Sequence, residues 1–216
     1  MTPVDPPTHP SSIRTGLIVL AAGASTRMGR PKQLIEIDGK TLLVRTVEAA
    51  LQTPVWPVVV VLGAHAAEVK TRLIRYPLLI AENAAWVEGM ASSIRTGMST
   101  LHSFSRAVDQ VVICLCDQPH FSAGTIYRLL EARAKSNRSI VAAHYRNRLG
   151  APALFSAASF PALASLSGDE GARHLLVQAS LTGDVEAVDL PELAVDLDTP
   201  GDIERLLQSQ KEVKES

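Results

Sequence analysis

Residues 20–32 combine glycines, small side chains and cations in the order Leu-Ala-Ala-Gly-Ala-Ser-Thr-Arg-Met-Gly-Arg-Pro-Lys. Glycine and alanine let a backbone approach a ligand closely and turn its N–H groups toward it. Arg27, Arg30 and Lys32 lie close together with no acid between them. A backbone cradle with clustered cations is typical of a loop that binds a polyphosphate. The segment has neither the Gly-Lys-Ser/Thr of a P-loop nor G-x-G-x-x-G spacing, and an ordinary turn with a solvated Arg30 is the structural alternative.

An acid follows the apolar run of residues 111–116, in the order Cys-Asp-Gln-Pro. At the end of a buried strand, Asp117 would lie where doubly wound sheets bind ligands. A carboxylate there can hold Mg²⁺ while a triphosphate supplies the other oxygen ligands. Asp198, two residues beyond Asp196, is a second candidate metal ligand, because positions i and i+2 of a strand share a face. A turn cap at Asp117 and a helix start at Asp198 and Thr199 are the alternatives.

The pattern L-A-A-G-x-S-x-R-M-G-x-x-K of residues 20–32 resembles the signature of the MobA-like nucleotidyltransferases, and more narrowly that of the molybdenum cofactor cytidylyltransferases. The resemblance implies a Rossmann-like fold, Mg²⁺, an NTP donor and a phosphate acceptor. It implies that Asp117 binds the metal, and Asp198 lies in a D-x-D-T-P segment that the family shares. We expect Arg27, Lys32 and Asp117 to act in catalysis. The nucleotide-binding residues expected in the loop are Leu20, Ala21, Ala22, Gly23, Ser25, Arg27, Gly29 and Lys32.

Three later segments are compared with family motifs and supply further candidates. The family's N-x(5)-G-M-x-x-S resembles residues 83–93, and its G-D-x-G-A-R resembles residues 168–173. The cytidylyltransferases usually have Gly-His-Pro where this chain has Gly-Ala-Pro at residues 150–152, so the identity of the acceptor stays open. Ordinary helix caps and a surface arginine are the structural alternatives. Asn83, Ser92 and Ser93 are expected at the nucleotide, and Gly89, Gly150, Pro152, Asp169 and Arg173 at the acceptor.

The reaction that the resemblance implies is Mg²⁺-dependent transfer of CMP from CTP to the phosphate of molybdenum-molybdopterin, with release of pyrophosphate. CTP is favoured over GTP because Ala22 stands where the GTP-using branch has a glycine. Catalysis would depend on positioning and on stabilisation of developing charge, with no nucleophilic side chain. The alternatives are another NTP transferase, using GTP on molybdopterin or acting on a sugar phosphate, and a non-catalytic molybdenum cofactor carrier or insertion protein. A molybdenum hydroxylase or its chaperone is a candidate partner.

The composition of the chain excludes some classes of binding partner. Lys and Arg number 21 against 22 Asp and Glu, and aromatic residues make up 4%. A nucleic-acid binder needs a basic excess, and single-strand binding uses aromatic stacking, so we expect no nucleic-acid partner. No apolar run is long enough to span a membrane, and the Pro-rich start argues against a signal peptide, so we expect a cytoplasmic protein. Cys114 and Cys116 are too few for a disulfide framework or a four-cysteine zinc site.

The candidate residues require elements that bring them together. Apolar runs predict buried strands at residues 17–20, 58–62, 78–81 and 111–116, and helical periodicity predicts helices at residues 42–52, 66–74, 91–101 and 125–134. Later strands are predicted at residues 140–144, 153–155, 185–188 and 193–197, and later helices at residues 160–166, 172–181 and from Thr199 onward.

This alternation of strands and helices predicts an α/β fold, specifically a Rossmann-like doubly wound, mostly parallel sheet with helices on both faces, as a single domain. We expect residues 1–12 to form a disordered Pro-rich arm. Residues 13–207 would form the nucleotidyltransferase domain, and residues 208–216 a polar tail.

Overall fold

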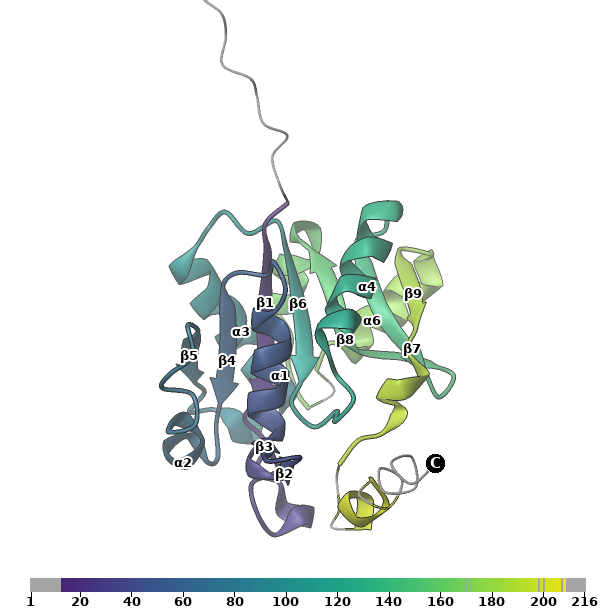
Figure 1. The fold of residues 1–216 in the computed structure, drawn as a ribbon. Coiled ribbons are helices and arrows are strands. Elements are labelled where there is room, and N and C mark those ends of the chain that lie inside the picture. Colours follow the sequence, from purple (N-terminus) through teal and green to yellow (C-terminus); the bar gives the residue numbers. More distant parts are fainter. Residues whose placement is uncertain (1–12, 170, 198, 200, 207, 209–216) are drawn as a thin grey trace, which may run out of the picture.

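A computed structural model describes residues 13–169, 171–197, 199, 201–206 and 208. These residues form one seven-stranded sheet in the order β5-β4-β1-β6-β8-β7-β9 and a two-stranded ribbon of β2 and β3 (Figure 1). The strands of the large sheet are β1 (Thr15–Ala21), β4 (Val58–Leu62), β5 (Leu79–Glu82), β6 (Gln110–Leu115), β7 (Ile140–Tyr145), β8 (Arg148–Ser156) and β9 (Val185–Asp189). The ribbon consists of β2 (Glu36–Ile37) and β3 (Lys40–Thr41).

The large sheet is mostly parallel. β1 pairs in parallel with β4 and β6, β4 with β5, and β7 with β9, whereas β8 is antiparallel to both β6 and β7. The chain runs outward from β1 through β4 to β5 and then returns to the other side of β1 as β6. The strand order therefore reverses between β1 and β6, and α/β sheets bind ligands beyond the carboxyl ends of the strands at such a point.

Helices cover both faces of this sheet. They are α1 (Leu42–Leu51), α2 (Ala66–Lys70), α3 (Met90–Phe104), α4 (Ala123–Lys135), α5 (Phe160–Ala164) and α6 (Arg173–Thr182). On one face, Val47 of α1 and Ile126 of α4 belong to a single buried cluster, and on the other face Met98 of α3 and Leu176 of α6 belong to a second. Figure 1 shows α1 and α4 in front of the sheet, with α3 and α6 behind it. Cover on both faces explains why every residue of β4, Val-Val-Val-Val-Leu, is apolar and buried.

Short 3₁₀ helices lie between these elements, and residues 201–206 form a further helix. They are η1 (Thr26–Met28), η2 (Lys32–Leu34), η3 (Trp86–Glu88), η4 (Ala157–Ser159) and η5 (Pro191–Ala194). Both η1 and η2 follow β1, and η3 lies between β5 and α3. These three short turns therefore border the carboxyl end of the parallel strands.

The structure confirms the predicted fold class and all but one of the predicted strands. The strand predicted at residues 193–197 is wrong, because Pro191 begins η5 and the backbone N–H of Leu197 donates to the carbonyl of Asp117, at 3.1 Å. Leu193 and Leu197 are buried, but Val195 between them is exposed, so the alternating apolar residues do not share one face. A proline cannot donate a strand hydrogen bond, which favours the turn.

The predicted helices are also confirmed, with differences at their ends. The helix predicted at residues 66–74 is shorter, since α2 ends at Lys70. The last helix begins near Thr199 as predicted, because the backbone N–H and the hydroxyl of Thr199 both donate to the Asp202 carboxylate, at 2.7 and 2.8 Å. The predicted arm at residues 1–12 and most of the predicted tail lie outside the described residues, so the domain bounds stay predictions. Within the part of the chain that is described, no helix combines the length and the apolar character needed to cross a membrane.

Candidate functional site

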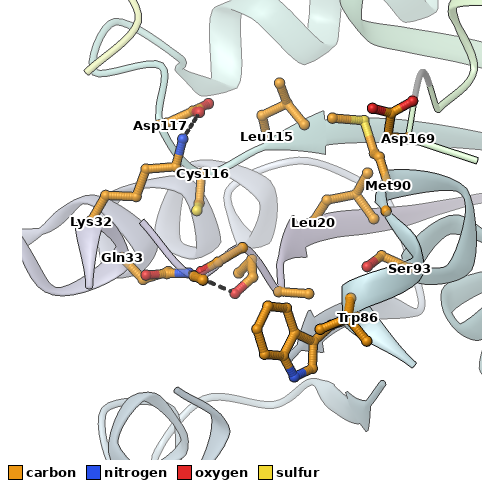
Figure 2. Close-up of a pocket in the computed structure, with 16 residues that line it drawn as sticks. Leu20, Lys32, Gln33, Trp86, Met90, Ser93, Leu115, Cys116, Asp117 and Asp169 are labelled. Atoms are coloured by element: carbon orange, nitrogen blue, oxygen red, sulfur yellow. Dashed lines mark hydrogen bonds and ion pairs between the residues drawn. The ribbon is translucent and has the colours of Figure 1, made fainter. Parts of the chain in front are cut away.

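A cleft of about 410 Å³ lies at the carboxyl ends of β1 and β6, where the strand order reverses (Figure 2). It is formed by the loop after β1, the turn before α3, the end of β6 and one residue of the segment before α6. The residues that line it are Leu20, Ala21, Ala22, Gly23, Ala24, Lys32, Gln33, Trp86, Val87, Gly89, Met90, Ser93, Leu115, Cys116, Asp117 and Asp169. The fold thus places the glycine-rich loop and the acid that follows β6 around one cavity.

The loop after β1 is fixed from behind by the side chain of Gln33, which is 1% exposed. The Gln33 Nε2 donates to the carbonyls of Ala21 and Gly23, both at 2.9 Å. The backbone N–H of Lys32 donates to the Ser25 Oγ at 3.0 Å, so the loop is also closed across its base. Ordered backbone of this kind can present N–H groups to an anion without reorganising when the anion binds.

Lys32 and Asp117 meet at one end of the cleft, and Figure 2 shows their side chains pointing toward each other. The ammonium group of Lys32 forms an ion pair with the Asp117 Oδ2, and these side chains are only 20% and 13% exposed. The Asp117 Oδ1 is buried and accepts no hydrogen bond from any residue that the structure describes. A buried carboxylate oxygen without a donor is unfavourable, and carboxylate oxygen is the ligand type that Mg²⁺ prefers. Asp117 therefore suits a divalent cation.

The second acid predicted to bind metal, Asp198, lies outside the described residues. Among the residues that are described, no group of three or more His, Cys, Asp or Glu side chains is arranged to hold a metal ion. A site built on few carboxylates is typical of Mg²⁺ bound together with phosphates, because substrate phosphates and waters then supply the remaining ligands.

Cys116 lines the cleft next to Asp117 but is not equipped as a nucleophile. Burial raises the pKa of the Cys116 thiol to about 12, with the Asp117 charge adding to the effect, and burial also raises the pKa of Cys114. The thiolate is the reactive form of cysteine, so both groups stay protonated and inert at neutral pH. This agrees with a reaction that uses no covalent intermediate on cysteine.

The turn before α3 is held by a buried polar network around Asn83. The Asn83 Nδ2 donates to the hydroxyls of Ser92 and Ser93, at 2.8 and 3.0 Å, and the Asn83 Oδ1 accepts from the backbone N–H of Ala85 at 3.0 Å. Ser93 lines the cleft, whereas Asn83 and Ser92 do not. Asn83 and Ser92 thus fix the path of the chain into η3 instead of lining the cavity.

Gly89 brings the segment before α6 against the start of α3. Its φ is +105°, and a Cβ at this position would lie 2.5 Å from the Asp169 Cα. The backbone N–H of Ala91 donates to the carbonyl of Gly168 at 3.2 Å. Only glycine fits this close approach, which places Asp169 on the wall of the cleft.

A second pocket, of about 220 Å³, continues from the cleft past Leu20, Met90 and Leu115, which line both cavities. Its other walls come from β6, β8 and the start of α6, and they are mainly apolar, with two cationic side chains, Arg148 and Arg173. A cavity of this composition would suit a largely apolar group that also carries negative charge.

Behind the second pocket, Gln118 ties the end of β6 to β8. Its Nε2 donates to the hydroxyl of Tyr145 at 3.2 Å and to the carbonyl of Ala151 at 3.1 Å, and the Tyr145 hydroxyl donates to that same carbonyl at 2.9 Å. Burial raises the pKa of the Tyr145 hydroxyl, so it remains a neutral donor. A Cβ on Gly150 would lie 2.8 Å from this hydroxyl, so the glycine allows the close packing.

The predicted site residues that the structure describes divide into three groups. Those on the wall of the main cleft are Leu20, Ala21, Ala22, Gly23, Lys32, Gly89, Ser93, Asp117 and Asp169. Gly150 and Arg173 line the second pocket. Ser25, Arg27, Gly29, Asn83, Ser92 and Pro152 line neither of the two cavities. Arg27 is exposed on η1 and Pro152 is buried within β8.

Two further residues that line the cleft, Gln33 and Trp86, were not predicted from the sequence. Gln33 directly follows the loop motif, and Trp86 stands at a position that the motif of residues 83–93 leaves unspecified. The one signal that could have drawn attention to Trp86 is the presence of a large aromatic residue between the predicted strand and the predicted helix. Burial of the Gln33 amide behind the loop has no signal in the sequence.

Comparisons with known proteins agree with this geometry. The family model described as the MobA-like NTP transferase domain matches residues 17–183. Nicotine blue oxidoreductase of Paenarthrobacter nicotinovorans is 35% identical to this chain, and the alignment covers 88% of this chain and 95% of that protein. The purine catabolism protein PucB of Bacillus subtilis is 31% identical, and the alignment covers 85% of this chain and 91% of PucB. The crystal structure of Rv0371c from Mycobacterium tuberculosis is similar to this structure, with a TM-score of 0.76 and 28% sequence identity, and the match covers 92% of this chain and all of Rv0371c. Another crystal structure of Rv0371c is of a complex with manganese.

Proposed function

The chain belongs to the MobA-like NTP transferase family, and from that premise we propose that it transfers CMP from CTP to the phosphate of molybdenum-molybdopterin. The observation that carries the proposal is the position of Lys32 and Asp117 at one end of a cleft that the glycine-rich loop after β1 also lines. This arrangement supports binding of a polyphosphate together with a cation.

In the proposed reaction, a phosphate oxygen of the acceptor attacks the α-phosphorus of the nucleotide. A new P–O bond forms, the bond to the bridging oxygen breaks, and pyrophosphate leaves with the electron pair. Lys32 and the backbone N–H groups of residues 21–24 would stabilise the charge that builds on the leaving group. The loop would also orient the triphosphate for an in-line attack, and Arg27 would contact it from η1.

Mg²⁺ is the metal proposed for this site, and the manganese in Rv0371c supports a divalent cation in this family. Asp117 would hold it through the carboxylate oxygen that accepts no hydrogen bond in the described structure, and Asp198 is a further proposed ligand. When bound, the ion neutralises charge on the phosphates and polarises the phosphorus.

The second pocket is the proposed site of the acceptor. A pterin is a flat ring system with polar edges, and its phosphate would have to reach the main cleft past Leu20, Met90 and Leu115. Arg173 and Asp169, which the motif resemblance assigns to the acceptor, lie on the walls of the two adjoining cavities. The preference for CTP over GTP is proposed from Ala22, which stands where the GTP-using branch has a glycine.

The direct test is to incubate the protein with Mg²⁺, each of the four NTPs and either molybdenum-molybdopterin or a sugar phosphate, and to measure pyrophosphate release and the mass of the product. We expect release with CTP and formation of a cytosine dinucleotide. If only GTP gave pyrophosphate release, the nucleotide donor would be GTP and not CTP. If only the sugar phosphate supported release, the acceptor would be a sugar phosphate and not molybdenum-molybdopterin. Tight binding of the pterin nucleotide without turnover would contradict the enzymatic proposal in favour of a carrier.

A redox reaction is the alternative raised by the name of one relative, nicotine blue oxidoreductase. One scaffold can carry different chemistries, so the name of a relative does not decide this. The same preparations should therefore be assayed for oxidation of NADH or NADPH in the presence of a redox dye. Steady oxidation without pyrophosphate release under any condition would show that nucleotidyl transfer is the wrong proposal.

A further inference from the structure

The cleft is chemically different at its two ends. Lys32 and Asp117 form a charged end, whereas Trp86, with Ala22 nearby, provides an apolar surface. Figure 2 shows the indole ring of Trp86 on the side of the cavity away from Lys32 and Asp117. Among the described residues that line this cleft, Trp86 is the one aromatic side chain. A nucleotide has the same polarity, with anionic phosphates at one end and a flat base at the other.

We propose that Trp86 forms a subsite for the nucleobase, with the indole ring stacked on the base of the bound NTP. The inference rests on the proposed function, since it takes an NTP as the ligand. Aromatic rings bind bases through their faces, because every base has a π-face of its own. Trp86 would thus contribute affinity and hold the base in place, while the choice among bases would depend on other groups.

The backbone around Trp86 is built to bring the indole close to the loop after β1. Gly63 follows β4, and a Cβ at Gly63 would lie 2.8 Å from the Trp86 Cβ and 2.5 Å from the carbonyl oxygen of Ala22. Any larger residue at position 63 would push the turn and the loop apart. The backbone N–H of Ala64 also donates to the Ala22 carbonyl at 3.1 Å, which links the segment after β4 directly to the loop after β1.

The turn that carries Trp86 is held by buried hydrogen bonds. The Asn83 Nδ2, in a side chain that is 5% exposed, donates to the hydroxyls of Ser92 and Ser93. The single proton of the Ser92 hydroxyl lies within reach of two acceptors, the carbonyls of Ala85 and Gly89, at 2.9 and 2.8 Å. A side chain mounted on such a turn is already positioned before the ligand arrives, which lowers the entropy cost of binding. The buried polar network of Asn83 thereby gains a role, namely to position the indole ring.

A purely structural role for Trp86 predicts different behaviour. The side chain is partly buried and packs against the core cluster that contains Leu20, Ala22 and Ile94. If packing were its only role, truncation would lower the stability of the protein and would weaken binding of every ligand of the cleft to a similar extent. A stacking role predicts a loss that is confined to ligands with a base.

The two tryptophans of the chain, Trp56 and Trp86, allow a fluorescence test with a matched control. Trp56 lies at the opposite end of the sheet, where its backbone N–H donates to the carbonyl of Thr15 at the start of β1 and its ring meets that of Phe104 edge-on. Trp56→Phe leaves Trp86 as the single indole, and Trp86→Phe leaves Trp56. Each variant is titrated with CTP and Mg²⁺, and separately with tripolyphosphate and Mg²⁺, which lacks a base.

We expect CTP to quench the emission of Trp56→Phe and to leave that of Trp86→Phe unchanged, while tripolyphosphate quenches neither. By calorimetry, Trp86→Ala should bind CTP about 5- to 150-fold more weakly, the range found when a base-stacking aromatic is replaced by alanine. Its affinity for tripolyphosphate should equal that of the wild type, which also shows that the variant is folded. Trp86→Phe should keep part of the CTP affinity.

Unchanged CTP affinity in Trp86→Ala, or an equal loss for CTP and tripolyphosphate, would overturn the stacking role. An unquenched Trp86 signal in Trp56→Phe at saturating CTP would do the same. Failure of wild-type protein to bind either ligand would be a different result, because it would overturn the proposed function itself.

Discussion

The ammonium group of Lys32 pairs with one carboxylate oxygen of Asp117, although the two residues are 85 positions apart in the sequence. The other oxygen of Asp117 is buried and has no hydrogen-bond donor among the described residues. Lys32, which is proposed to bind the phosphates, is thus paired with Asp117, which is proposed to bind the metal ion. A metal ion on the other oxygen of Asp117 would lie close to the Lys32 ammonium group, so the two positive charges would repel each other unless phosphates of the ligand lie between them.

Replacing Lys32 by methionine, which keeps a long side chain without charge, should have opposite effects on metal binding and on turnover. Mn²⁺, followed by electron paramagnetic resonance in the absence of nucleotide, should bind several-fold more tightly, because it is no longer repelled by an ammonium group beside Asp117. Turnover should fall about 10²–10³-fold, as when one donor to a developing charge is removed. Arg30→Met changes an exposed cation of the same loop and is the control. Unchanged Mn²⁺ affinity in Lys32→Met would contradict the repulsion.

Asp117→Asn removes the charge of the proposed metal ligand and keeps its shape. We expect Mn²⁺ binding in the presence of CTP to weaken at least about tenfold, because a carboxamide is a poorer ligand for a hard cation than a carboxylate. Asp109→Asn is the matched control, since this acid pairs with Arg14 at the amino end of β6 and its side chain is 47% exposed. Equal Mn²⁺ affinity for Asp117→Asn and Asp109→Asn, measured by calorimetry, would remove Asp117 from the metal site.

Gly89→Ala should lower the unfolding free energy by about 1–3 kcal/mol, because a non-glycine residue at φ +105° is strained and its Cβ would collide with the Asp169 Cα. The change should also displace Asp169 from the wall of the cleft and weaken binding of the acceptor. Gly124→Ala in α4 is the control, since its Cβ would meet nothing closer than the Ser122 Oγ at 3.5 Å and alanine favours a helix. Urea unfolding that gives equal stabilities for the two variants would show that the Gly89 contact is unimportant.

The core strands and the main catalytic candidates follow from local sequence. Runs such as Val58–Leu62 are apolar at every position, so a strand buried on both faces is predicted without ambiguity. Asp117 comes directly after such a run, and the topology of a doubly wound sheet then places it beside the loop after β1. Both predictions depend only on neighbours in the chain and on a general rule for parallel sheets.

The remaining features depend on contacts between distant segments. Asn83 carries the polar side chain of a motif, yet it bonds to Ser92 and Ser93 inside the turn and does not line the cleft. The apolar alternation at residues 193–197 imitates a strand, but Pro191 and the hydrogen bond from Leu197 to Asp117 decide the local structure. Sequence spacing indicates that a residue matters, whereas its partner in space determines what it does.

The support that Gln33 gives to the loop can be measured by replacing it with methionine, which has a similar shape and no amide. Without the Nε2 group, the carbonyls of Ala21 and Gly23 lose a buried donor, and leaving such groups unpaired should cost about 1–3 kcal/mol of unfolding free energy. The looser loop should also raise the KM for CTP about tenfold or more, because part of the binding energy would be used to order its backbone. Gln52→Met, at the exposed end of α1, should change the unfolding free energy by less than about 0.5 kcal/mol and leave KM unchanged. Urea unfolding and steady-state kinetics on both variants decide the matter: if Gln33→Met lost stability while keeping the wild-type KM, Gln33 would support the core of the protein and not the phosphate-binding loop.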